Sequence, residues 1–206
     1  MTHLYLIRHA DYLYDRVDGQ GPRRDQGLTP EGVHQATRLR DRLASSGEIK
    51  PDVFISSTER SAHETAQILQ PAFNQPIILD EAMEEWRSED GSLSDEEFMA
   101  RWQQVPKSQK GYYRWVEGGE NRMEFVLRVH LALNRILQDN QGQTIVIVTH
   151  GAVIQTSFVF FFGYGEASLE RALLEINRTS ITHWYQQQDR WVLERSNDTH
   201  HLGPTL

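Results

Sequence analysis

The sequence contains no cysteine among its 206 residues. Disulfides, zinc–thiolate sites, iron–sulfur clusters and thiol catalysis are therefore excluded. Long apolar runs are also missing, since the chain reaches Arg8 without the apolar stretch of a signal peptide. The most apolar later segment, residues 153–162, is shorter than the roughly 20 residues that a membrane span needs. We therefore expect a soluble, cytoplasmic protein with no membrane-spanning segment.

Positive charge is scarce as well. Lys and Arg number 21 against 29 Asp and Glu, which leaves a formal net charge of -8 at pH 7. A negative excess of this size repels nucleic acid and anionic lipid, so neither is an expected partner. Hydrophobic residues make up 38% and charged residues 24%, as in a globular domain of ordinary size. Any phosphate-binding pocket must therefore be a local cluster of positive side chains on an otherwise negative protein.

Predicted strands and helices alternate along most of the chain. Short apolar, often β-branched runs predict strands, and apolar residues at helical spacing predict helices. The strands are expected at residues 4–8, 52–56, 76–79, 144–149, 173–176, 180–185 and 191–194. The helices are expected after the cap Thr29 (apolar stripe Val33, Ala36, Leu39 and Leu43) and at 59–69, 94–102, 120–138 and 153–162.

This alternation predicts one α/β domain of three layers, in which helices flank a mostly parallel central sheet. The last two strands are expected to form an antiparallel hairpin at the sheet edge. Residues 15–21 are expected to form a loop. Residues 92–119, rich in Lys, Gln, Gly and aromatics, are expected to leave the core as a surface excursion. Its aromatic residues either form a lid over a substrate pocket or pack a surface loop.

Two histidines follow predicted strands directly. His9 ends the first strand beside Arg8, and His150 ends the most β-branched strand of the chain. In an open α/β sheet, ligands bind in the crevice beyond the carboxyl ends of the strands, where the two imidazoles can face each other. Each histidine alone is also compatible with a structural hydrogen bond. The equivalent positions of the two, with an arginine beside the first, favour a functional pair.

Two histidines with an arginine suit attack on phosphorus. Neutral imidazole is nucleophilic near neutral pH. Arginine stabilises the charge that spreads over the phosphoryl oxygens, and an acid must protonate the leaving alcohol. Histidine also binds zinc, but Arg8 beside His9 opposes a cation, and the chain has no His-Glu-x-x-His cluster. We expect no metal and no organic cofactor.

Six segments spread over almost the whole chain form an ordered set that resembles the motifs of one family, the histidine phosphatase superfamily, also called phosphoglycerate-mutase-like. Any one of them is a weak signal, whereas the set is specific. The segments are Arg8-His9-Ala10, Leu28-Thr29-x-x-Gly32-x-x-Gln35-Ala36, Ser56-Ser57-Thr58-Glu59-Arg60, Thr149-His150-Gly151, Asn177-Arg178-Thr179-Ser180-Ile181-Thr182 and Asn197-Asp198-Thr199-His200-His201-Leu202.

The resemblance implies a phosphoglycerate-mutase-like fold over residues 1–206 and a role for each matched residue. His9 would become phosphohistidine, with the phosphoryl oxygens held by Arg8, Arg60 and His150, and with Gly151 beside them. The acid of the family follows the third strand, where Glu85 is the candidate and Glu84 the alternative. These two also suit a solvated acidic loop at residues 81–89.

The second arginine has two possible registers. Counting forward from Ser56 places Arg60 at the family's position, whereas counting back from Glu64-Thr65-Ala66 places Ser61 there. Of these two, only Arg60 can carry charge. If the helix starts differently, Arg60 is instead a solvated residue of its first turn.

The resemblance favours a phosphatase within the family. Mutase members carry Asn six residues after the nucleophile, where this chain has Asp15. An acidic residue there would repel a small polyanion such as a sugar bisphosphate, although it is also suited to capping a turn. We expect a phosphatase acting on a phosphorylated small molecule or a phosphoprotein. Phosphoglycerate mutase-type phosphotransfer and a non-catalytic phospho-ligand binding module remain the alternatives.

Overall fold

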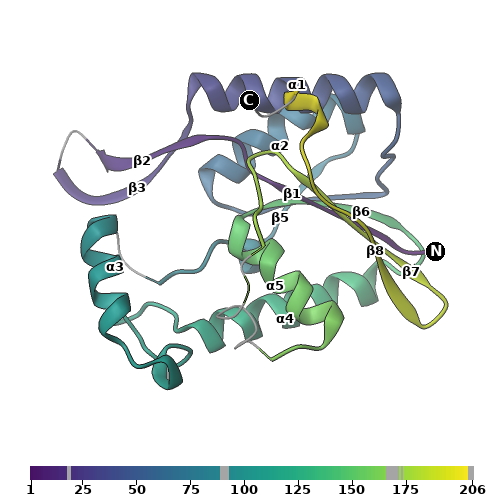
Figure 1. Ribbon diagram of the computed structural model, residues 1–206. Helices are drawn as coiled ribbons and strands as arrows, with labels where there is room; N and C mark the ends of the chain where they lie inside the picture. Colours follow the sequence, from purple (N-terminus) through teal and green to yellow (C-terminus); the bar gives the residue numbers. More distant parts are fainter. Residues whose placement is uncertain (18–19, 89–92, 166–171, 173, 204–206) are drawn as a thin grey trace.

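The computed structural model describes residues 1–17, 20–88, 93–165, 172 and 174–203. A six-stranded sheet, in the order β5-β4-β6-β1-β7-β8, lies at its centre, and a separate two-stranded sheet pairs β2 with β3 (Figure 1). The strands are β1 (His3–Arg8), β2 (Tyr12–Val17), β3 (Gln20–Leu28), β4 (Val53–Ser56), β5 (Ile77–Leu79), β6 (Thr144–Thr149), β7 (Ile181–Gln187) and β8 (Arg190–Asp198).

The sheet is parallel over four strands and antiparallel over two. β5, β4, β6 and β1 run parallel to one another, and β1 pairs with β6 so that Arg8 lies opposite Thr149. β7 runs antiparallel to β1, and β8 antiparallel to β7. The predicted mostly parallel sheet with a closing antiparallel hairpin is confirmed.

Helices cover both faces of the sheet, as predicted for three layers (Figure 1). α1 and α2 lie on one face and α4 and α5 on the other, so the sheet separates two apolar cores. The helices are α1 (Pro30–Ser46), α2 (Arg60–Phe73), α3 (Asp95–Gln104), α4 (Arg122–Asp139) and α5 (Gly151–Phe162), with short 3-10 turns at Glu81–Met83, Lys107–Gln109 and His200–Leu202.

Local signals in the sequence set the helix starts. The Thr29 hydroxyl accepts the backbone N–H of Gly32 and caps α1, and Ser94 caps α3 within a capping box. Gly32 also allows close packing, because a Cβ there would lie 1.9 Å from the Asp11 carbonyl oxygen. No helix in the described ranges is long and apolar enough to cross a membrane.

Three expectations about local structure were wrong. Val33 is 46% exposed, and Gly32 takes its place on the buried face of α1. Residues 174–176 are irregular backbone rather than a strand, while Leu173 lies outside the described residues. The expected loop at 15–21 is largely strand, because β2 and β3 pair across it with residues 18–19 outside the description.

The surface excursion carries α3 and an aromatic cluster. Trp102 packs edge-on against Trp86, with ring centroids 6.1 Å apart, and Trp115 lies 5.5 Å from Trp102. Trp86 in turn donates its indole N–H to the Glu120 carbonyl at 3.1 Å. The cluster therefore packs this excursion against the segment that carries Glu85.

Candidate active site

The topology brings several chain segments to one edge of the sheet. β1, β6, β4 and β5 are parallel, so their carboxyl ends lie at the same edge, and β7 begins there because it runs the opposite way. Each strand is followed or preceded there by polar residues. The hairpin β2–β3 and α3 flank this edge (Figure 1).

His9 and His150 lie next to each other at this edge, with their ring planes tilted by 53°. They continue the paired strands β1 and β6, and their ring centroids are 4.9 Å apart. Each is 2% exposed. The structure therefore brings together the two histidines that the sequence placed at equivalent strand ends.

His9 is held as a neutral base. Its Nδ1 lies 2.8 Å from the Ala10 carbonyl oxygen, which can only accept, so Nδ1 carries the proton and Nε2 keeps its lone pair. Burial, His150 and Arg178 together hold the pKa of His9 well below its ordinary value. The Nε2 atom is therefore unprotonated at neutral pH and available as a nucleophile.

Arg178 supplies a positive charge that the sequence analysis did not assign. Its Nη1 lies 2.9 Å from His9 Nε2, and its guanidinium lies over the Tyr12 ring at 4.9 Å. Tyr12 also packs edge-on against the His9 ring at 4.8 Å. The signal was present in residues 177–182, which carried part of the family resemblance, but the position directly before β7 was not used to infer a role.

Arg8 lies beside the start of α5. Its Nη1 donates to the Ile176 carbonyl, and its Nε is buried with no partner among the described residues. A Cβ on Gly151, the first residue of α5, would lie 3.5 Å from the Arg8 guanidinium carbon. Arg8 and Gly151 thus lie together, and Arg8 keeps a buried donor free for a ligand.

The structure does not bring Arg60 to the histidines. Its side chain is 62% exposed, and its Nε donates to Glu64 at 2.6 Å. The reason is that Arg60 is the first residue of α2, and its guanidinium pairs with Glu64, one helical turn further along the chain. Ser61, the alternative register, is fully buried, and its N–H donates to Asp25 at 2.7 Å. The positive charge beside His9 comes from Arg178 instead.

His150 is also held neutral. Its Nε2 lies 2.9 Å from the Ser57 hydroxyl and 3.3 Å from a Glu59 carboxyl oxygen. Burial, followed by the charges of Arg8 and Arg178, lowers its pKa to about 3. A neutral His150 carries one ring N–H, so it can donate a hydrogen bond to a phosphoryl oxygen without carrying a positive charge.

The two acid candidates have different surroundings. Glu85 lies half-buried beside α5, and its oxygens accept the N–H groups of Trp86 at 3.0 Å and Ala152 at 3.3 Å. Burial raises its pKa, partly offset by these backbone donors. Glu84 instead pairs with Arg87 at 2.7 Å and with the Thr58 hydroxyl. Of the two, Glu85 is therefore the one whose surroundings favour a protonated carboxyl.

Arg128 of α4 fixes the segment that carries Glu85. Its guanidinium donates to the carbonyls of Ala82 at 2.9 Å, Glu84 at 3.0 Å and Glu85 at 3.0 Å. The Glu120 carboxylate pairs with the same guanidinium at 2.7 Å. This arginine satisfies backbone acceptors that a loop would otherwise expose, and so keeps the acid in one position.

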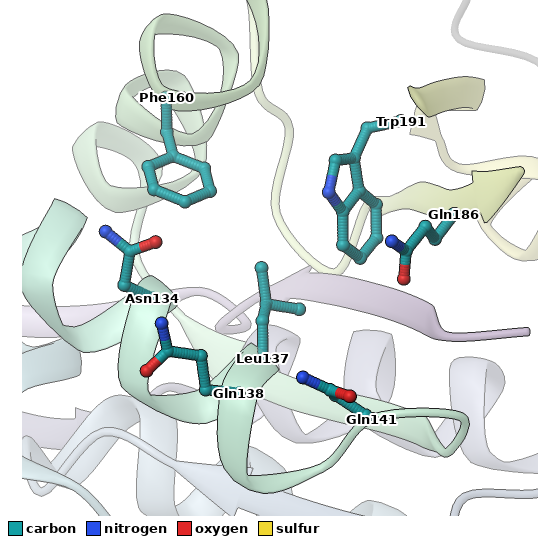
Figure 2. A pocket seen from close by; sticks show the side chains of 7 residues that line it. All are labelled: Asn134, Leu137, Gln138, Gln141, Phe160, Gln186 and Trp191. Atoms are coloured by element: carbon teal, nitrogen blue, oxygen red, sulfur yellow. The ribbon is translucent and has the colours of Figure 1, made fainter. Parts of the chain in front are cut away.

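A pocket without charged residues lies away from His9, toward the edge of the sheet where β1 begins (Figure 2). It has a volume of about 260 Å³ and is lined by amides and apolar rings. Gln186 lies near the amino end of β1, because its neighbour Tyr185 pairs with His3. With no charged residue in its lining, this pocket does not suit a phosphate. The residues are Asn134, Leu137, Gln138, Gln141, Phe160, Gln186 and Trp191.

Within the described ranges, no group of three or more His, Asp or Glu side chains is arranged to hold a metal ion. The site nevertheless offers positive charge from Arg8 and Arg178, two neutral imidazoles and a half-buried carboxyl. Such a set can bind a phosphate, attack phosphorus and protonate a leaving oxygen.

Known proteins resemble this chain over its whole length. The probable phosphoglycerate mutase GpmB of Salmonella paratyphi C is 29% identical over 219 residues, which cover 100% of this chain and 98% of the relative. Bacillus stearothermophilus YhfR has a TM-score of 0.77 at 26% identity, and it covers 98% of this chain and 100% of its own. The phosphoserine phosphatase of Entamoeba histolytica, solved with 3-phosphoglyceric acid, has a TM-score of 0.74 at 25% identity with the same coverage.

The sequence profile of one family matches nearly the whole chain. It is the histidine phosphatase superfamily (branch 1), and the match extends over residues 4–199. The ordered motifs, the six-stranded sheet and the paired histidines at its edge agree with that match. The chain therefore belongs to the histidine phosphatase superfamily.

Proposed function

We propose that this protein is a phosphomonoester phosphatase that acts through a phosphohistidine intermediate on His9. One observation carries the proposal most: a buried imidazole, kept neutral, directs its unprotonated Nε2 toward Arg178 and faces His150. The nucleophile and the groups that would hold the phosphoryl oxygens therefore meet at one point. Membership of the superfamily supports the same chemistry.

The proposed reaction has two displacements. His9 Nε2 forms a bond to phosphorus as the bond to the leaving oxygen breaks, and Glu85 gives that oxygen a proton. Arg8, Arg178 and His150 stabilise the charge on the phosphoryl oxygens. Water then attacks the phosphohistidine and releases phosphate, and its proton returns to the Glu85 carboxylate.

Trapping the intermediate tests this proposal. We expect a brief reaction with a ³²P-labelled alkyl phosphate, quenched without acid, to yield a phosphoprotein that is stable to base and labile to acid. His9→Ala should form no such adduct, and turnover should fall by at least about 10³-fold, because covalent catalysis is lost. An adduct of the same stability in His9→Ala would place the nucleophile elsewhere.

The proposed chemistry uses arginine charge and no metal. Arg8 has a free buried donor, and Arg178 lies against the nucleophile, so both can neutralise a phosphate. We expect dialysis against a chelator to leave turnover unchanged. Loss of turnover that a divalent cation restores would contradict this part of the proposal.

The substrate is proposed to be a phosphorylated small molecule or a phosphoprotein. Phosphoglycerate mutase activity is the second candidate, because the Salmonella relative is described as a probable mutase. Conversion of 3-phosphoglycerate to its 2-isomer, measured beside hydrolysis of a panel of phosphate esters, separates the two. Failure to turn over any aryl phosphate would favour a phospho-ligand binding module.

A further inference from the structure

Glu59 has no role in the reaction outlined above, although it lies at the site. It directly precedes α2, and its backbone N–H donates to the Ser57 hydroxyl at 3.2 Å. Its carboxyl oxygen lies 3.3 Å from Nε2 of His150, the nitrogen that also contacts Ser57. A phosphoryl group held by His150 would therefore lie within reach of this carboxyl.

The surroundings of Glu59 oppose a negative charge. Burial is the main factor that disfavours its ionisation, and the nearby carboxyl groups of Glu85, Glu84 and Asp25 add to that effect. The nearby cations are engaged elsewhere: Arg60 pairs with Glu64, and Arg87 with Glu84. In the part of the chain that the structure describes, no lysine or arginine forms an ion pair with Glu59.

Burial and the three neighbouring carboxyl groups together raise the pKa of Glu59 to about 8, although a hydrogen bond from the Glu85 backbone N–H partly offsets the rise. A phosphate dianion arriving beside His150 would add negative charge. It would be repelled by a carboxylate, whereas a neutral carboxylic acid can donate a hydrogen bond to it.

We propose that Glu59 binds the phosphate of the substrate as a neutral carboxylic acid, donating its proton in a hydrogen bond to a phosphoryl oxygen. The inference rests on the proposed function, because it takes the pocket beside His9 as the phosphate site. In this pocket a protonated carboxyl does what a second positive charge from Arg60 was expected to do. Phosphate binding then depends on a proton carried by the protein.

The pH dependence of phosphate binding isolates this proton. Between about pH 8 and about pH 9.5, inorganic phosphate keeps its charge while Glu59 ionises. The pKa of Tyr12, which also faces the site, is raised by burial, so the phenol stays neutral there. His150 is already neutral. Asp25 and Glu84 are the other carboxyls near Glu59, and Glu85, whose pKa burial also raises, is the group whose ionisation must be told apart from that of Glu59.

The test measures the dissociation constant of inorganic phosphate by calorimetry across this interval. We expect the wild-type constant to rise roughly tenfold, since one proton must be regained for binding. Glu59→Gln keeps a permanent neutral donor of the same shape, so its affinity should not change with pH. Glu84→Gln is the control that keeps Glu59: its phosphate affinity should still fall as pH rises, with the fall beginning at a lower pH because one charge that disfavours Glu59 ionisation is gone.

A second measurement does not depend on any variant. Calorimetry of the wild type in two buffers of different ionisation enthalpy should show uptake of close to one proton per phosphate near about pH 9. No uptake, a wild-type slope retained by Glu59→Gln, or loss of phosphate binding by Glu59→Gln at every pH would each overturn the inference. A slope abolished in Glu85→Gln but kept in Glu59→Gln would overturn it too and assign the proton to Glu85.

These outcomes are separable from those of the proposed function. A phosphohistidine on His9 together with pH-independent phosphate binding would support the phosphatase function and contradict the role of Glu59. Proton-coupled phosphate binding without a phosphohistidine would support Glu59 and favour a binding module.

Discussion

The two sides of the site respond oppositely to the same burial. On one side His9 and His150 are bases, and burial lowers their pKa values. On the other side Glu59 and Glu85 are acids, and burial raises theirs. Both sides become neutral, because a low-dielectric environment disfavours whichever form is charged.

Because of this difference, the carboxyl and imidazole groups of the site lose their protons in the reverse of the order that free side chains follow. In water a carboxyl group loses its proton at a lower pH than imidazolium does. In this site the imidazoles are unprotonated at a pH where Glu59 keeps its proton. A nucleophilic base and a proton-donating acid can therefore coexist at one pH, which displacement at phosphorus requires.

The largest expected effect comes from Glu85→Gln, which tests the acid side of the site. We expect a loss of about 10²–10⁴-fold on alkyl phosphates, whose leaving oxygen needs a proton. Loss on p-nitrophenyl phosphate should be far smaller, because nitrophenolate leaves as a stable anion. Steady-state rates on both substrates check this. Equal losses would show that Glu85 shapes the pocket without donating, and a selective loss in Glu84→Gln would move the role to that residue.

The basic side is tested by a pair of arginines. Arg178→Ala removes the guanidinium beside His9 and should reduce kcat/KM by about a hundredfold, or about 3 kcal/mol. Arg60→Ala removes an exposed group paired with Glu64 and should change the rate by less than about threefold. The reverse ranking would mean that Arg60 turns into the pocket when phosphate binds.

The smallest expected effect concerns the pH range of the nucleophile. Because burial lowers the pKa of His9, the free base persists below the ordinary imidazole value as pH falls, and protonation sets in only at a lower pH. Nitrogen NMR of ¹⁵N-histidine protein should show the His9 ring still neutral at about pH 5.5. His9→Ala assigns the signal. A midpoint near the ordinary value would remove the contrast between the two sides.

Much of the site followed from the chain itself. His9 and His150 stand directly after short apolar strands, and parallel strands deliver such residues to one edge. Glu85 was expected only because the family resemblance places an acid after the third strand. Arg178 could not be placed in the same way, because it stands before a strand rather than after one, and β7 runs antiparallel to β1. Only the sheet order puts the start of β7 at the catalytic edge.

The sequence by itself determined the family, the alternation of strands and helices and the strand-end histidines, because these depend on short, local patterns of residue type. The tertiary structure decided which charges reach the pocket. Arg60 is an exposed first-turn residue of α2 that pairs with Glu64, and Arg178 arrives from a segment 169 residues distant from His9. It also decided which groups keep their protons, since burial and the distance between charges exist only once the chain has folded.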